Sequence, residues 1–320
     1  MTAPTVPQAP PAAGVADPPS GAAPPRRPQP ARRAERPPRQ PRRPVQGTPA
    51  LVSSISTMVA LICLWAVLHL LVLAQVSHAR AQDLLFDEFR VQLAGATAPV
   101  DGTAEPGAPV ALLRIPRLDL EEVVVEGTAP GDLFAGPGHK RDSVLPGQVG
   151  TSVVFGRAAT YGAPFADLAE LEAGDRIEVT TGQGELDLTV LGVRRAGDPV
   201  RPRSDGFARV TLVSAEGSGR LAGFRPGEAL YVDAEAPKGF PSPGGYSPAV
   251  PTSEEAMARG VESLPSVCLG LALLIALTLG VIAARLRWSV GLVWVVAAPV
   301  AIALAWFTTD AAMRLFPNLI

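Results

Sequence analysis

The chain has 320 residues and an almost balanced charge, with 28 basic and 30 acidic side chains, but the charges are segregated along it. Residues 1–50 carry eight arginines against only Asp17 and Glu35. The two cysteines, Cys63 and Cys268, lie in long apolar runs, which argues against a disulfide framework, an exposed nucleophile or a metal site. Three histidines without ligand spacing argue against zinc, so we expect neither a metal nor a cofactor.

The first segment, residues 1–50, is rich in Pro, Ala and Arg and holds almost nothing bulky to bury, which predicts a disordered cytoplasmic tail. It lacks aromatic side chains and a folded basic face, so nucleic acid is not an expected partner. Residues 51–76 form an apolar run long enough to cross a bilayer as a helix. The arginines before this run place its N-terminal side in the cytoplasm.

Residues 77–109 are expected to form an amphipathic stalk helix followed by a Gly/Pro/Ala linker. Residues 110–236 are expected to form the folded domain, in which short β-rich segments alternate with turns, as in a sandwich or barrel. Those segments are 110–115, 121–126, 151–156, 175–181, 185–193, 208–214 and 229–235. One short helix is predicted at 164–171.

Residues 237–263 read as a Pro/Gly/Ser linker, and two further apolar runs, 264–284 and 288–307, have the length of spanning helices. The basic turn between them is assigned to the cytoplasm. Residues 308–320 are then a short extracellular tail. Because no charge lies in these two runs, the proline at 299 is interpreted as a packing feature. The expected location is the cell membrane, in multi-pass topology, with the β-domain and the C-terminus outside.

The β-rich domain carries six local motifs in a fixed order: Leu113 to Leu118 (LRIPRL), Val125 to Gly127 (VEG), Leu133 to His139 (LFAGPGH), Pro146 to Gly150 (PGQVG), Phe155 to Phe165 (FGRAATYGAPF), and Leu171 with Gly174 and Asp175. In this order the motifs resemble those of the sortases, the membrane-anchored cysteine transpeptidases of Gram-positive bacteria, and the actinobacterial class E/F kind most. The resemblance implies an all-β sortase-like β-barrel of about eight strands with short helices, here accompanied by three transmembrane α-helices.

The resemblance also places the family's catalytic residues. Sortases use a cysteine thiolate, a histidine acid/base and an arginine that stabilises the oxyanion. The histidine position falls on Arg157, the cysteine position on Ala215 and the arginine position on Ala229. The domain contains no cysteine at all, so the resemblance implies a degenerate triad that no shift of register restores.

Five residues are candidates for lining the old cleft: Arg157, Tyr161, Ser214, Arg220 and Arg225. Ser214 neighbours the nucleophile position, but adjacent strand residues point to opposite faces, so we expect it to face away. The two arginines of the 216–227 connection could project into the cleft with Arg157 or remain solvated.

Three functions stay open at this point. The first is a non-catalytic binding or scaffolding module at the cell surface, which holds a sorting-signal peptide, a cell-wall component or a surface protein. The second is an active sortase-type transpeptidase or hydrolase with relocated catalytic groups. The third is a membrane-assembly subunit that works through its C-terminal helices. The lipid bilayer is an expected partner in each case.

Overall fold

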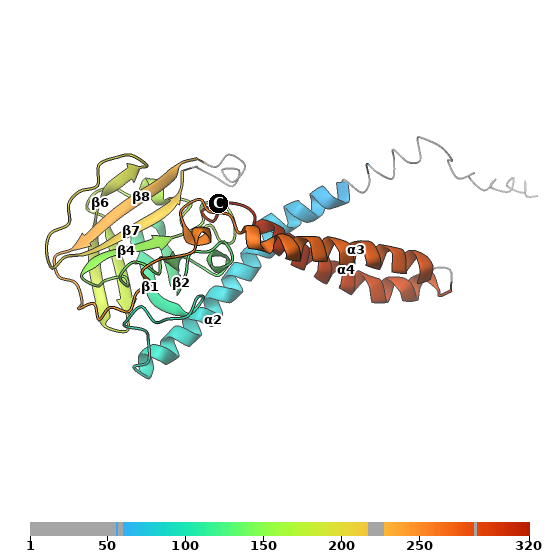
Figure 1. The fold of residues 1–320 in the computed structure, drawn as a ribbon, viewed down its shortest axis with the longest axis horizontal. Helices are drawn as coiled ribbons and strands as arrows, with labels where there is room; N and C mark the ends of the chain where they lie inside the picture. Colours follow the sequence, from blue (N-terminus) through green and yellow to red (C-terminus); the bar gives the residue numbers. More distant parts are fainter. Residues whose placement is uncertain (1–55, 57–59, 217–226, 285–286) are drawn as a thin grey trace, which may run out of the picture. The chain divides into compact units, whose positions relative to one another are not determined.

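The computed structural model describes residues 56, 60–216, 227–284 and 287–320, all within the compact unit Ser53–Ile320 (Figure 1). The predicted tail, residues 1–50, lies outside the described residues, as do Arg220, Arg225 and the first two residues of the basic turn, 285–286.

Eight strands form a closed barrel in the order β1-β2-β3-β4-β7-β8-β6-β5. Their bounds are β1 Pro109–Ile115, β2 Leu120–Glu126, β3 Gly138–His139, β4 Gly150–Phe155, β5 Arg176–Thr181, β6 Gly184–Arg195, β7 Ala208–Ala215 and β8 Ala229–Ala236. The predicted β-rich domain with about eight strands is confirmed. The seven predicted segments each fall on one of these strands, and β3, with two residues, was too short to predict.

The barrel interior follows from the alternation of apolar residues along the strands. In β6, Leu188 and Val190 are buried while Asp187 and Thr189 are exposed, as expected for a strand with one face on the core. β7 is buried along its whole length, because it lies between β4, which it pairs in parallel, and β8, which it pairs antiparallel. The ends of these three strands build the site described below.

The predicted helix at 164–171 is wrong, since only a short 3₁₀ turn forms there, Leu168–Glu170. The chain before it is held in another conformation. Ala163 has a φ of 47°, and the amide of Phe165 donates to the carbonyl of Arg157 at 3.0 Å. The stretch forms i→i+3 turns instead, in which the amide of Ala166 donates to Ala163 and that of Glu170 to Asp167.

The stretch predicted as an amphipathic stalk helix lies in α2, Ala74–Ala94, and this helix packs on the barrel. It is preceded by helical residues 60–68 and a π-helical turn, His69–Leu73. Gln82 forms hydrogen bonds with both backbone groups of Val123 in β2, at 2.7 and 3.2 Å. Phe89 and Val123 are buried in the same small hydrophobic cluster, so the helix is fixed to the barrel wall.

Two helices among the described residues are long and apolar enough to cross a membrane, Val261–Ala284 and Gly291–Met313. The prediction of three spanning helices is corrected to two candidates. Of the first predicted span, 51–76, the structure describes residue 56 and residues 60–76. The helix formed by residues 60 onward continues into the polar α2. The two candidates contain α3, Leu264–Ala284, and most of α4, Val290–Met313, which contact one another (Figure 1).

The predicted end of the last span at residue 307 is also wrong. Helix α4 continues to Met313 and includes Asp310, so the helix pair does carry a charge. The carboxylate is accommodated because it accepts hydrogen bonds from Tyr161 Oη at 2.8 Å and Trp306 Nε1 at 2.9 Å. His69 Nε2 lies 3.3 Å from the same carboxylate. This polar cluster joins the first helical segment, the barrel and α4.

The residues between barrel and α3 lie along the barrel rather than forming an open linker. The backbone of Phe240 exchanges hydrogen bonds with Gly147 at 2.9 Å and Val149 at 2.8 Å. Farther along, Glu254 is buried and forms a salt bridge with Arg141. These contacts bring residues 254–260 to the end of the barrel where the candidate site lies.

Candidate binding cleft

The three positions that the resemblance assigns to catalysis lie at one end of the barrel. Arg157 follows the end of β4, Ala215 ends β7 and Ala229 begins β8. Ala215 and Ala229 are direct partners in the β7–β8 ladder. β4 pairs with β7 in parallel, with Phe155 opposite Val213, so Arg157 emerges beside the same strand end.

A second hydrophobic cluster, separate from the barrel interior, fills this end of the barrel. Ala215 and Ala229 belong to it, together with two residues from the far end of the sequence, Leu319 and Ile320. The remaining buried members are Leu133, Phe155, Ala158 and Val213. Figure 1 shows the end of the chain returning to the barrel after α4. We call residues 317–320 the tail segment.

The tail segment is held in the cleft by backbone as well as side-chain contacts. The amide of Ala158 donates to the carbonyl of Leu319 at 2.9 Å, and the amide of Asn318 donates to the carbonyl of Ala258 at 2.9 Å. Asn318 Nδ2 donates to two further carbonyls, those of Thr128 and Glu255, both at 2.9 Å. Asn318 and Leu319 are fully buried and Ile320 nearly so. The stretch predicted as a short extracellular tail, 308–320, begins within α4, and its last two residues are buried in the second hydrophobic cluster.

Arg157 is fully buried and organises the polar side of the cleft. Nη1 donates to Thr160 Oγ1 at 3.0 Å and to the carbonyl oxygen of Ile320, and Nη2 donates to the carbonyl of Pro130 at 2.8 Å. Thr160 Oγ1 in turn donates to the same Ile320 oxygen at 2.6 Å. The guanidinium also lies 4.7 Å from the ring centre of Phe134, a cation–π contact. Burial lowers the pKa of Arg157 to about 10, so the group remains a cation at neutral pH.

Tyr161 lies beside Arg157 but its hydroxyl points to α4. The ring stacks on Phe134 with centres 4.0 Å apart, and the hydroxyl donates to Asp310 at 2.8 Å. Burial, followed by the charge of Asp310, raises the pKa of Tyr161 far above its usual range. The residue is therefore a neutral hydrogen-bond donor that links the wall of the cleft to the last helix.

Ser214 is not brought into the cleft. Its side chain is fully buried, and Oγ lies 3.1 Å from the carbonyl of Gly156 and 3.2 Å from that of Phe165, to which it donates. The hydroxyl is thus on the opposite face of β7 from Ala215, as adjacent strand residues must be. The other two candidates, Arg220 and Arg225, lie outside the described residues.

The histidine of the domain, His139, is also engaged elsewhere. Nδ1 lies 2.8 Å from the carboxylate of Glu126, and Nε2 lies 2.9 Å from the carbonyl of Val144. Both members of the His139–Glu126 pair are buried inside the barrel wall. This arrangement ties β3 to β2 and leaves no free nitrogen for proton transfer in the cleft.

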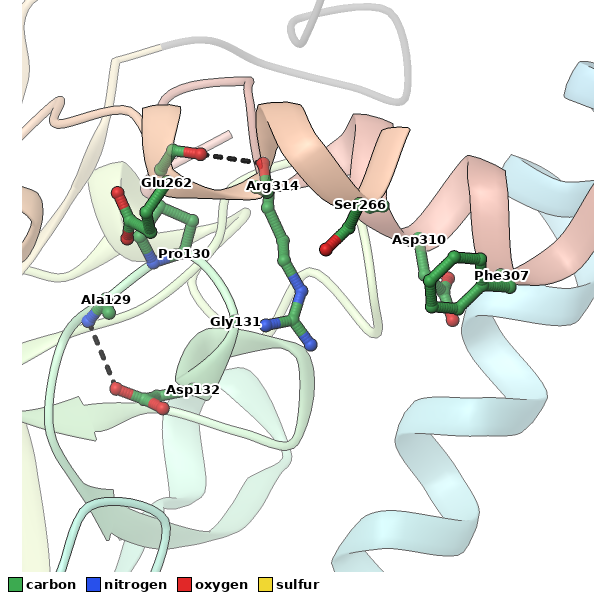
Figure 2. A pocket seen from close by; sticks show the side chains of 12 residues that line it. Ala129, Pro130, Gly131, Asp132, Glu262, Ser266, Phe307, Asp310 and Arg314 are labelled. Carbon is green, nitrogen blue, oxygen red and sulfur yellow. Dashed lines mark hydrogen bonds between the residues drawn. The ribbon is translucent and has the colours of Figure 1, made fainter. Parts of the chain in front are cut away.

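A cavity of about 420 Å³ adjoins the cleft where the barrel meets α3 and α4. Figure 2 shows Arg314 reaching between Gly131 and Ser266, with Asp132 and Asp310 on either side. Asp132 accepts a hydrogen bond from the amide of Ala129 at 3.3 Å, and burial raises its pKa to about 6. The cavity shares Pro130 with the contacts of Arg157, so the two sites have a common wall.

Sequence reasoning missed the residues that fill the cleft. The five-residue stretch that starts at Phe316 follows an apolar helix and has no motif or periodicity of its own. The only signal was compositional. The two aliphatic residues at 319 and 320 lie outside the predicted spans, and no predicted hydrophobic core contains them.

Comparison with known proteins gives the family. Residues 113–212 match the family model for the sortase domain. Sortase D of Bacillus subtilis (strain 168) is 34% identical over 87 residues, which is 27% of this chain and 42% of that protein, so the match spans less than half of the relative.

Several solved structures that the chain matches are also sortases. The SrtF sortase of Corynebacterium diphtheriae has 26% identity and a TM-score of 0.37, with 48% of this chain and 96% of that chain covered. A sortase E mutant from Streptomyces avermitilis has 28% identity and a TM-score of 0.33, covering 41% and 88%. A sortase D5 transpeptidase from Clostridium perfringens has 17% identity and a TM-score of 0.39, covering 50% and 97%. From the match to the family model and to the curated relative, the β-barrel of this chain is a sortase-family domain.

Proposed function

We propose that this sortase-family domain is a non-catalytic binding module, anchored in the cell membrane and facing outward, that holds a peptide in the former catalytic cleft. The observation that carries the proposal is that Arg157, Ala215 and Ala229 lie together at one end of the barrel, and the resemblance to sortases assigns each of these positions to a catalytic residue.

The chemistry of these three side chains supports a loss of catalysis. A methyl group at 215 cannot attack a carbonyl, and a general acid/base works best with a pKa near the ambient pH. Arg157, with a pKa of about 10 and its Nη1 and Nη2 donors committed, does not meet that condition. Ala229 offers no side-chain donor for an oxyanion. The nearest hydroxyl on β7, that of Ser214, points to the other face.

Three features of the cleft support binding. They are an apolar floor, a buried cation that donates to the main-chain oxygen of Ile320, and backbone groups that pair with the tail segment. Sortases act on sorting-signal peptides of surface proteins and on the cell wall, so a surface protein, its sorting-type peptide or a cell-wall peptide is the proposed partner class. The two apolar helices, Val261–Ala284 and Gly291–Met313, support anchoring in the membrane.

The test is turnover by the whole chain in detergent or nanodiscs, with fluorogenic sorting-type peptides and an active sortase assayed in parallel. We expect neither hydrolysis nor transpeptidation, and no effect of cysteine alkylation, because Cys63 and Cys268 both lie in apolar runs outside the barrel. Ser214→Ala and Arg157→Ala are the matched variants. Turnover that either variant abolishes would show that the chain is an enzyme and overturn the proposal.

A further inference from the structure

The tail segment, residues 317–320, lies in the cleft in the manner of a bound peptide. Its backbone pairs with the barrel at one point, where Ala158 donates to Leu319, and with the preceding loop at another, where Asn318 donates to Ala258. Arg259 and Pro317 form an isolated antiparallel bridge beside these bonds. Main-chain pairing of an extended segment combined with side-chain pockets is a recurrent mode of peptide recognition.

Each position of the segment has its own surroundings. The side-chain amide of Asn318 donates to the carbonyls of Thr128 and Glu255, which belong to different loops. The side chains of Leu319 and Ile320 are buried in the cluster that contains Ala215 and Ala229, the two small residues at former catalytic positions. The carbonyl of Ile320 is held by Arg157 and Thr160. The site therefore makes contacts that suit an asparagine followed by two aliphatic residues.

We propose that the cleft is a peptide-binding site whose resident ligand is the chain's own tail segment, and that an external partner is an extended peptide with the same Asn-aliphatic-aliphatic chemistry that must displace it. The proposal rests on the proposed function, since it names the peptide class for the same cleft and adds the element that controls access to it.

The tether sets the expected strength of this competition. A ligand joined by a short connection has an effective concentration in the millimolar range. Only Arg314, Leu315 and Phe316 connect α4 to the tail segment, so a free peptide at micromolar concentration competes poorly with it. Removal of the tail segment is expected to strengthen binding of a free peptide by about 100-fold.

The experiment measures binding of a fluorescent synthetic peptide with the sequence of residues 314–320 to the whole chain in nanodiscs, by anisotropy. The comparison is the intact protein against a variant that ends at Phe316. We expect the shortened protein to bind at least tenfold more tightly than the intact one. A control peptide carrying Leu319→Asp should bind at least tenfold more weakly than the native peptide, because the aspartate would enter the apolar cluster.

A second arm keeps the test decisive if the shortened variant does not fold. A protease site inserted between Leu315 and Phe316, in the turn after α4, allows the tail segment to be cut from the folded protein. The proposal predicts that the labelled peptide then exchanges into the cut protein and not into the uncut one. A folded, cut protein that retains its original segment and excludes the peptide overturns the proposal, as does a folded shortened variant that does not bind.

These outcomes are separate from those of the turnover assay. Turnover with peptide exchange would remove the claim of a non-catalytic domain and leave the resident ligand in place. No turnover and no exchange would leave a non-catalytic domain in which the tail segment is a fixed part of the core.

Discussion

Replacing Leu319 by alanine tests how firmly the tail segment is held. The side chain is fully buried in the cleft cluster. Removing its three outer carbons loses about 2.4 kcal/mol of transfer free energy, and the cavity left behind brings typical values to about 3 kcal/mol. The backbone carbonyl at 319 remains, so the hydrogen bond from Ala158 survives as a reporter of docking.

The assay is hydrogen exchange at the Ala158 amide in the whole chain. If the tail segment undocks as a separate unit, a loss of about 3 kcal/mol speeds exchange at this amide by about 100-fold. The amide of Gly156, which donates to Val213 within the barrel at 2.9 Å, should keep its rate. Phe316→Ala is the matched control, because that side chain is half exposed and should change exchange less than about tenfold.

Two results would refute this reasoning. An unchanged Ala158 rate in Leu319→Ala would mean that the buried leucine does not hold the segment. Equal acceleration at Ala158 and Gly156 would mean that the segment and the barrel open together, so that the segment is not a ligand.

Asp132→Asn should remove a pH dependence of the free energy of unfolding. Burial raises the pKa of Asp132 from 3.8 to about 6, so the folded state binds this proton more tightly than the unfolded state does. The group therefore adds stability as the pH falls from about 6 to about 4. At pH 7 the variant should be more stable than the wild type by about 3 kcal/mol, and the difference should nearly vanish by pH 4, measured by thermal unfolding. A pH-independent difference contradicts the assignment. Gly270→Ala should destabilise the contact between α3 and α4, because a Cβ there would collide with the side chain of Thr308, whereas Gly280→Ala meets no atom within 4 Å. We expect Gly270→Ala to lower the thermal midpoint in detergent. Gly280→Ala should raise the midpoint slightly, because alanine stabilises a helix by up to about 1 kcal/mol relative to glycine. Equal effects would show that the close approach at Gly270 is not needed.

The strands could be predicted from the sequence because alternation of apolar and polar residues is a local pattern that fixes which residues face the core. The same rule placed Ser214 on the other face of β7 from Ala215. The positions Arg157, Ala215 and Ala229 came only from the resemblance to the sortase motifs, and the pairing of Ala215 with Ala229 was not predicted.

What could not be predicted depends on contacts between distant residues. Arg157 and Ile320 are 163 positions apart, and no periodic pattern links them. The extension of α4 through Asp310 depends on hydrogen bonds donated by Tyr161 and Trp306. Hydropathy averaged over a window of the sequence does not include such bonds. The stretch 164–171 is also held by a contact between distant residues, since Ser214 donates to the carbonyl of Phe165, 49 positions away.

The most direct measurement is the alkylation rate of a cysteine placed at the nucleophile position. Ala215→Cys, in a chain that also carries Cys63→Ala and Cys268→Ala, puts a single thiol in the cleft cluster. If the tail segment closes the cleft, the thiol should react slowly in the intact protein and at least tenfold faster once residues 317–320 are removed, with no peptide turnover in either form. Equal alkylation rates, or cleavage of a sorting-type peptide by the intact chain without the new cysteine, would contradict a closed, non-catalytic cleft.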